Sequence, residues 1–136
     1  MTYQLSFFGD LLSPEVDRIL REIAIPVKPD EVEILKTEIK HYLDRIVQAQ
    51  RKNEFLNEPL ARRIGEIGVL LLKSYHSYTK EQQALVTGAV RYFVLAKDKD
   101  NDLHSPLGFD DDAEVMNFVL KSIGREDLII DIEGDY

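Results

Sequence analysis

The chain of 136 residues has no cysteine and no long hydrophobic run. Without cysteine there can be no disulfide framework, thiolate nucleophile or Cys-based metal centre, and the chain fits a reducing compartment. Its longest dense apolar stretch, residues 67–72, is far shorter than the roughly 20 residues of a membrane-spanning helix. The first ten residues lack the basic and apolar regions of a signal peptide. We therefore expect a soluble, cytoplasmic protein that does not associate with membranes.

Glycine and proline are also sparse, with 7 and 5 residues, whereas hydrophobic residues make up 44% of the chain. This apolar fraction is too high for a disordered chain, and the length is close to that of a common single domain. We expect one compact domain over residues 1–136. Its tail, residues 124–136, is either mobile or docked on the body.

Basic residues are scarce in the C-terminal third. Residues 1–96 hold 13 acidic and 13 basic side chains, whereas residues 97–136 hold 12 acidic and 4 basic ones, so this third carries the whole net charge of −8. Such a charge repels the phosphates of nucleic acids and anionic lipid surfaces. It attracts cations or a basic protein surface. We therefore expect no nucleic-acid partner.

Helix-start signals recur along the chain, and apolar residues follow them in steps of three and four. The predicted starts are Ser13 with Pro14, Asp30 with Glu33, the segment from Asn57 to Pro59, Thr79 with Gln82, and Asp111 with Glu114. Gly124 is the predicted end of the last helix. No alternating pattern is strong enough to build a sheet. The sequence predicts an all-α compact bundle of about five helices, with a long acidic loop before the last helix and an acidic tail.

From Tyr92 to Val115 the sequence reads YFVLAKDKDNDLHSPLGFDDDAEV. This segment resembles the signature of the YkvA-like family, a small helical domain of unknown function found widely in bacteria. The matching residues are Tyr92, Phe93, Asp98, Asp102, Gly108, Phe109, Asp111, Asp112 and Ala113. The chain departs from the family pattern in having Ala96-Lys97 before the first aspartate and a polar run at residues 99–101. The resemblance implies the helical fold and no established chemistry.

The acidic loop is the best candidate site, because calcium and magnesium require several oxygen ligands converging on one point. The candidate metal ligands are Asp98, Asp102, Asp111 and Asp112, with Asp100, His104 and Asp110 as weaker candidates. An EF-hand is excluded, since Leu103 stands where glycine is required and Phe109 where the bidentate glutamate should be. The simpler interpretation is that Asp111 caps the last helix and the other acids are solvated.

Other motifs give no chemistry. Gly65 and Gly68 form a G-x-x-G beside Arg62 and Arg63, but they lie inside a helical pattern, which favours close helix packing over a nucleic-acid clamp. No nucleophile has a recognisable setting, so we assign no catalytic or cofactor-binding residue and incline to a non-enzyme.

Three functions remain open. The first is a non-enzymatic protein-interaction module whose acidic C-terminal third meets a basic partner. The second is a domain that binds calcium or magnesium, for structure or for metal-assisted hydrolysis. The third is a scaffold that self-associates through the apolar segment of residues 128–132.

Overall fold

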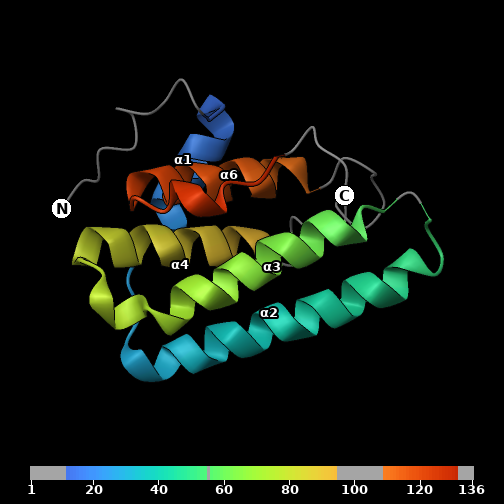
Figure 1. Ribbon diagram of the computed structural model, residues 1–136, viewed down its shortest axis with the longest axis horizontal. Coiled ribbons are helices and arrows are strands. Elements are labelled where there is room, and N and C mark those ends of the chain that lie inside the picture. The colour runs from blue at the N-terminus through green and yellow to red at the C-terminus, as the bar shows by residue number, and fades with distance from the viewer. Residues whose placement is uncertain (1–11, 55, 95–108, 132–136) are drawn as a thin grey trace.

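A computed structural model describes residues 12–54, 56–94 and 109–131. These residues form five α-helices and two short 3-10 helices, with no strand among them, which confirms the predicted all-α class (Figure 1). The elements are α1 (Pro14–Ile23), α2 (Pro29–Gln50), α3 (Glu58–Lys73), η2 (Tyr75–Ser77), α4 (Lys80–Val94), α6 (Asp110–Ser122) and η3 (Glu126–Leu128). Within the described ranges, no helix combines the length and apolarity that crossing a membrane requires.

Three of the predicted helix starts are formed by the expected side chains. Ser13 and Asn57 each accept a hydrogen bond, of 3.2 Å, from the backbone N–H three residues further on. Thr79 and Gln82 cap one another, because each side-chain oxygen accepts from the other residue's backbone N–H, at 3.2 and 2.9 Å. These local bonds satisfy N–H groups that have no partner inside the helix.

The predicted start of the second helix is wrong by two residues. The helix begins at Pro29 rather than after a cap at Asp30, and Lys28 occupies the position before it. The Glu31 carboxylate, not that of Glu33, accepts the Lys28 backbone N–H at 3.1 Å. Proline is well suited to the first helical position, since its fixed φ is helical and the missing N–H would have no partner there.

Helix α4 lies at the centre of the bundle. It contacts α1, α2, α3 and α6, and Figure 1 shows it between α6 on one side and the antiparallel pair of α2 and α3 on the other. Residues 84–90 are all buried, so this helix is covered on every side. Helix α1 approaches it closely at Gly88, where an added Cβ would lie 2.8 Å from Leu20 Cδ1 and 3.1 Å from Ala24 Cα.

A buried tyrosine ties two connections together. The Tyr75 hydroxyl accepts a hydrogen bond from the Val27 backbone N–H at 2.8 Å and donates one to the Val27 carbonyl at 3.0 Å. Tyr75 lies in η2, between α3 and α4, whereas Val27 lies between α1 and α2. The clamp fixes where α2 begins relative to the core.

The chain turns sharply after α6 and returns along it. Gly124, at φ +78°, ends the helix as predicted, and the Arg125 N–H donates to the Leu120 carbonyl at 2.8 Å. Further on, the Asn117 side chain donates to the Ile130 carbonyl at 2.9 Å and accepts the Ile130 N–H at 2.7 Å. Ile130 is 4% exposed. The described part of the tail therefore packs on α6 of its own chain.

Candidate functional site: the acidic first turn of α6

The candidate site residues divide between two segments of the chain. Four of them fall outside the described residues, namely Asp98, Asp100, Asp102 and His104. The remaining three, Asp110, Asp111 and Asp112, form the first turn of α6, and Glu114 follows on the next turn. We call Asp110, Asp111, Asp112 and Glu114 the acidic turn.

The predicted cap at Asp111 is wrong. Helix α6 begins at Asp110, so Asp111 is its second residue, and Phe109 occupies the capping position without a side-chain cap hydrogen bond. Asp111 and Glu114 thus do not form a capping pair. Carboxylates within the first turn still interact favourably with the helix dipole. Asp111 is exposed to solvent and Asp112 is buried, so these neighbours face different surroundings.

An aromatic chain through the core holds the acidic turn in place. The ring of Phe109, which is 1% exposed, lies 6.4 Å from the ring of Phe93 near the end of α4. Phe93 in turn meets Tyr42 of α2 edge to face, with the centroids 5.0 Å apart. From the sequence, Phe109 was assigned only to the YkvA-like resemblance and to the exclusion of an EF-hand, and its role as an anchor was missed. A large aromatic residue directly before a helix start is the signal that could have revealed it.

The carboxylates of the acidic turn repel one another. Partial burial, followed by the charge of Asp111, raises the pKa of Asp110 above its ordinary value. Burial and the charges of Asp111 and Asp110 likewise raise the pKa of Glu114. Among the described residues, no lysine or arginine forms an ion pair with these three side chains. Asp110, Asp111 and Glu114 therefore present negative charge that no ion pair within the described residues neutralises.

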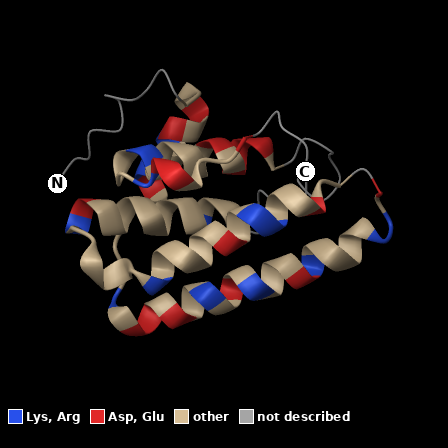
Figure 2. Cartoon of the chain, in the orientation of Figure 1, with Lys and Arg blue, Asp and Glu red and all other residues tan. Residues whose placement is uncertain are grey.

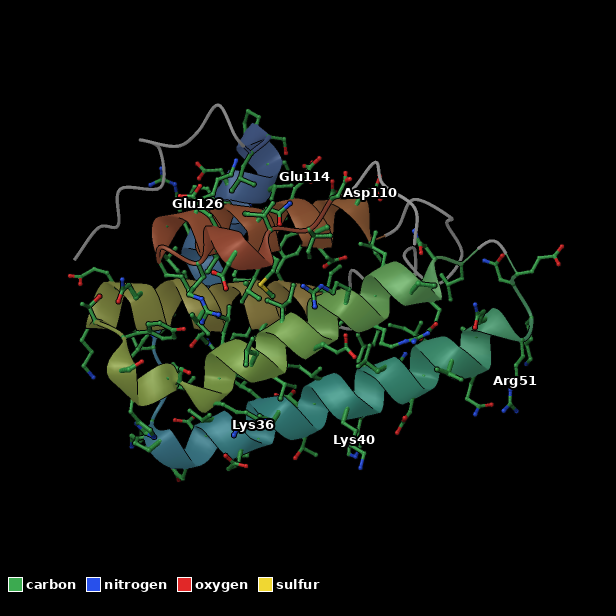
Figure 3. All side chains as sticks on the ribbon, viewed as in Figure 1. Lys36, Lys40, Arg51, Asp110, Glu114 and Glu126 are labelled. Carbon is green, nitrogen blue, oxygen red and sulfur yellow. The ribbon has the colours of Figure 1, made fainter. Side chains whose placement is uncertain are left out.

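Charge is segregated over the described surface as well. Residues 109–131 hold seven acidic and two basic side chains, whereas the other described residues hold 12 and 13. One of the two basic residues, Arg125, pairs with Asp127 at 3.1 Å. Figure 2 shows both signs mixed along α2 and α3, and red segments at the start of α6 and in η3. Figure 3 places Asp110, Glu114 and Glu126 on the side of the molecule opposite Lys36 and Lys40 of α2.

Among the described residues, no three carboxylate or imidazole groups converge on a point where they could hold a metal ion. Asp111 and Asp112 are two of the four predicted ligands, and the other two, Asp98 and Asp102, lie outside the described residues. The metal site stays a prediction.

The G-x-x-G motif is a packing feature, as predicted. Gly65 and Gly68 lie inside α3, where an added Cβ on Gly65 would meet Leu43 Cδ1 at 2.8 Å and one on Gly68 would meet Ile39 Cδ1 at 3.2 Å. The glycines allow α2 and α3 to approach closely. Neighbouring Arg62 is paired with Glu58 on its own helix, with Nε and Oε2 2.9 Å apart. This hydrogen bond lowers the pKa of Glu58.

Comparison with known proteins gave no match to a family model, to a curated protein or to a solved structure.

Proposed function

We propose that this protein is a non-enzymatic interaction domain that binds a basic segment of another protein through the acidic turn of α6. The observation that carries the proposal is the crowding of Asp110, Asp111 and Glu114 at the start of α6, where burial and then the neighbouring charges raise the pKa of Asp110 and Glu114. A lysine or arginine side chain brought against these carboxylates relieves that repulsion, so the free energy favours a cationic partner over water. The cytoplasm is the compartment in which we place this interaction.

The rest of the surface supports the same partner chemistry. Residues 97–136 carry a net charge of −8 and residues 1–96 carry none, so a basic partner is attracted to the C-terminal third of the chain. The aromatic anchor at Phe109 fixes the acidic turn to the core, so little conformational entropy is lost there on binding. Binding is expected to weaken with salt, because Asp111 and Glu114 are exposed and Asp110 is half-buried.

The direct test is a fluorescence anisotropy titration of a labelled lysine- and arginine-rich peptide, carried out over a range of salt concentrations. The test variant is Asp110→Asn/Asp111→Asn/Glu114→Gln. The matched control, Glu38→Gln/Glu54→Gln/Glu81→Gln, removes the same charge from exposed positions on the body. We expect the affinity of the first variant for the peptide to fall about tenfold or more, and that of the control variant to stay close to the wild-type affinity. Equal losses in both variants would show that only the net charge matters and would refute the proposal.

A divalent cation is the second candidate ligand, and the buried Asp112 beside repelling Asp110 and Asp111 favours it. Crowded carboxylates are the oxygen ligands that calcium and magnesium prefer. In this proposal Asp98 and Asp102 complete the ligand set, with Asp100 and His104 as weaker contributors. The cation would hold the loop to the start of α6.

The cation proposal makes a separate measurement possible. Added calcium or magnesium at millimolar concentration should raise the melting temperature, because a ligand of the native state stabilises it by mass action. The response should disappear in Asp98→Asn and in Asp111→Asn, and persist in the Glu38→Gln control. An unchanged melting temperature, or a response that both variants retain, would exclude this ligand set.

A further inference from the structure

A shallow groove of about 600 Å³ runs along the outer surface between α2 and α3. Its centre is apolar, formed by Leu43 of α2 and by Val69 and Leu70 of α3. Leu70 is 40% exposed, and Leu43 and Val69 are half-buried. Gly65 lines the same groove, where the absence of a side chain leaves room beside Leu43.

Charged side chains border this apolar centre in a definite order. Leu43 meets Gly65, so their chain neighbours Asp44 and Glu66 lie at one end of the groove. Ile39 reaches Gly68 toward the other end, where Lys40 lies on α2 and Lys73 follows further along α3. Because α2 and α3 are antiparallel, the C-terminal part of α2 lies beside the N-terminal part of α3 (Figure 1). The acidic residues of the two helices therefore lie at the same end of the groove, and so do the lysines. The groove therefore has an acidic end and a basic end, with Arg63 beyond Glu66 at its rim.

We propose that this groove is the self-complementary interface of a homodimer. A two-fold axis through the apolar centre places the acidic end of one copy against the basic end of the other, twice in each dimer. Asp44 and Glu66 then face Lys40 and Lys73 of the second copy, while Leu43 and Leu70 pack across the axis. Among the described residues, none of these four charged side chains has an ion pair of 4 Å or less within the chain, although Glu66 lies close enough to Arg62 to raise its pKa.

The proposal is independent of the acidic turn, because it uses a different surface and a different partner. Figure 3 shows Lys40 on the side of the molecule away from Asp110 and Glu114. A dimer formed through α2 and α3 therefore leaves both acidic turns exposed. It carries two such turns on one assembly, which increases the avidity for a partner with repeated basic segments.

The test exploits the two-fold symmetry with two charge-reversed variants. Lys40→Glu/Lys73→Glu makes both ends of the groove acidic, and Asp44→Lys/Glu66→Lys makes both ends basic. Each variant alone should have a dimer dissociation constant at least about tenfold higher than that of the wild type. An equimolar mixture should restore a dimer, because acidic ends then face basic ends in both halves of the interface. Sedimentation equilibrium from about 1 µM to about 1 mM protein measures all four samples.

The design separates local from overall repulsion. The Asp44→Lys/Glu66→Lys variant has less net negative charge than the wild type, so weaker self-association by this variant has to come from the interface itself. Circular dichroism checks that both variants keep the helical fold, which is expected because the four substituted side chains are exposed. A wild-type mass of 15.7 kDa at every concentration would overturn the proposal. Dimers that persist in both variants, or a mixture that stays monomeric, would also overturn it.

Discussion

The ring of Phe109, directly before α6, lies 6.4 Å from the ring of Phe93, one residue before the end of α4, at an angle of 58°. Both rings are 1% exposed. The contact joins the last turn of α4 to the start of α6 inside the core, so packing of Phe109 positions the acidic turn. Tilted aromatic pairs of this kind stabilise the folded state by more than the burial of their apolar surface alone.

Replacing this anchor should therefore affect stability strongly. Phe109→Ala is expected to reduce the free energy of unfolding by about 3–5 kcal/mol, because it leaves a cavity beside Phe93 at the start of α6. Urea denaturation followed by circular dichroism measures the change. Ile25→Ala is the control, since Ile25 is 54% exposed and its truncation should cost less than about 0.5 kcal/mol. A cost below about 1 kcal/mol for Phe109→Ala would contradict the anchoring role.

The sequence predicted best what is decided locally. The helix starts at Ser13, Asn57 and Thr79 depend on side chains that bond to backbone three residues away, so a short window contains the whole signal. The start of α6 was misplaced because the local capping pattern favoured Asp111, whereas the helix begins directly after Phe109, which is buried against a residue sixteen positions earlier. Tertiary packing overrides capping preference there.

The candidate site was predicted in the same partial way. The distribution of acidic residues along the chain was enough to select the segment that contains the acidic turn. The burial of individual side chains could not be predicted from the sequence. Asp112 is buried, whereas its neighbour Asp111 is exposed. Leu70 and Leu72 likewise lie two residues apart in α3, yet Leu70 borders the groove and Leu72 is in the core. Such differences depend on which neighbouring helix covers each face.

Two glycines in helices should respond to the same substitution with effects of different size on stability. At Gly88 an added Cβ would lie 3.1 Å from the Ala24 backbone. This backbone cannot move without shifting α1, so Gly88→Ala should lower the free energy of unfolding by about 1–3 kcal/mol. At Gly65 the closest atom belongs to the half-buried Leu43, which can move into the groove. The gain in helix propensity then offsets the contact, and Gly65→Ala should change stability by less than about 1 kcal/mol. Thermal unfolding of both variants checks the order, and equal effects would contradict it.

The tail should detach when its amide clamp is removed. Asn117→Ala takes away both hydrogen bonds to Ile130, so the stability should fall by about 1–3 kcal/mol and the Ile130 amide should exchange faster with solvent. Hydrogen exchange followed by NMR measures this site directly. Ser122→Ala on the same helix is the control, because its hydroxyl donates to the Phe118 carbonyl within α6 and not to the tail residue Ile130. Unchanged protection of Ile130 in Asn117→Ala would show that apolar packing alone holds the tail.

The pH dependence of stability should contain two opposite contributions. Asp110 and Glu114 have raised pKa values, so near these values the native state keeps protons that the unfolded chain has released, and stability falls as the pH rises through that interval. Glu58 has a lowered pKa because of Arg62, so its contribution is present above the unfolded pKa and is lost as the pH falls through the folded one. Its side chain is mostly buried, whereas Arg62 is exposed, which weakens the pair.

Asp111→Asn separates these contributions. Asp111 raises the pKa of both Asp110 and Glu114, so its neutralisation should lower both values, although burial keeps them above those of free side chains. The pKa of Glu58 should stay the same, because its perturbing charge is Arg62. Carbon-13 NMR titration of the side-chain carboxyl groups gives all three values in one experiment. Stability is the poorer readout here, since the substitution also removes a favourable charge from a helix N-terminus, worth about 0.3–1 kcal/mol. If the values for Asp110 and Glu114 do not move, the acidic turn is not electrostatically coupled, and the attraction we infer for a basic partner loses its main support.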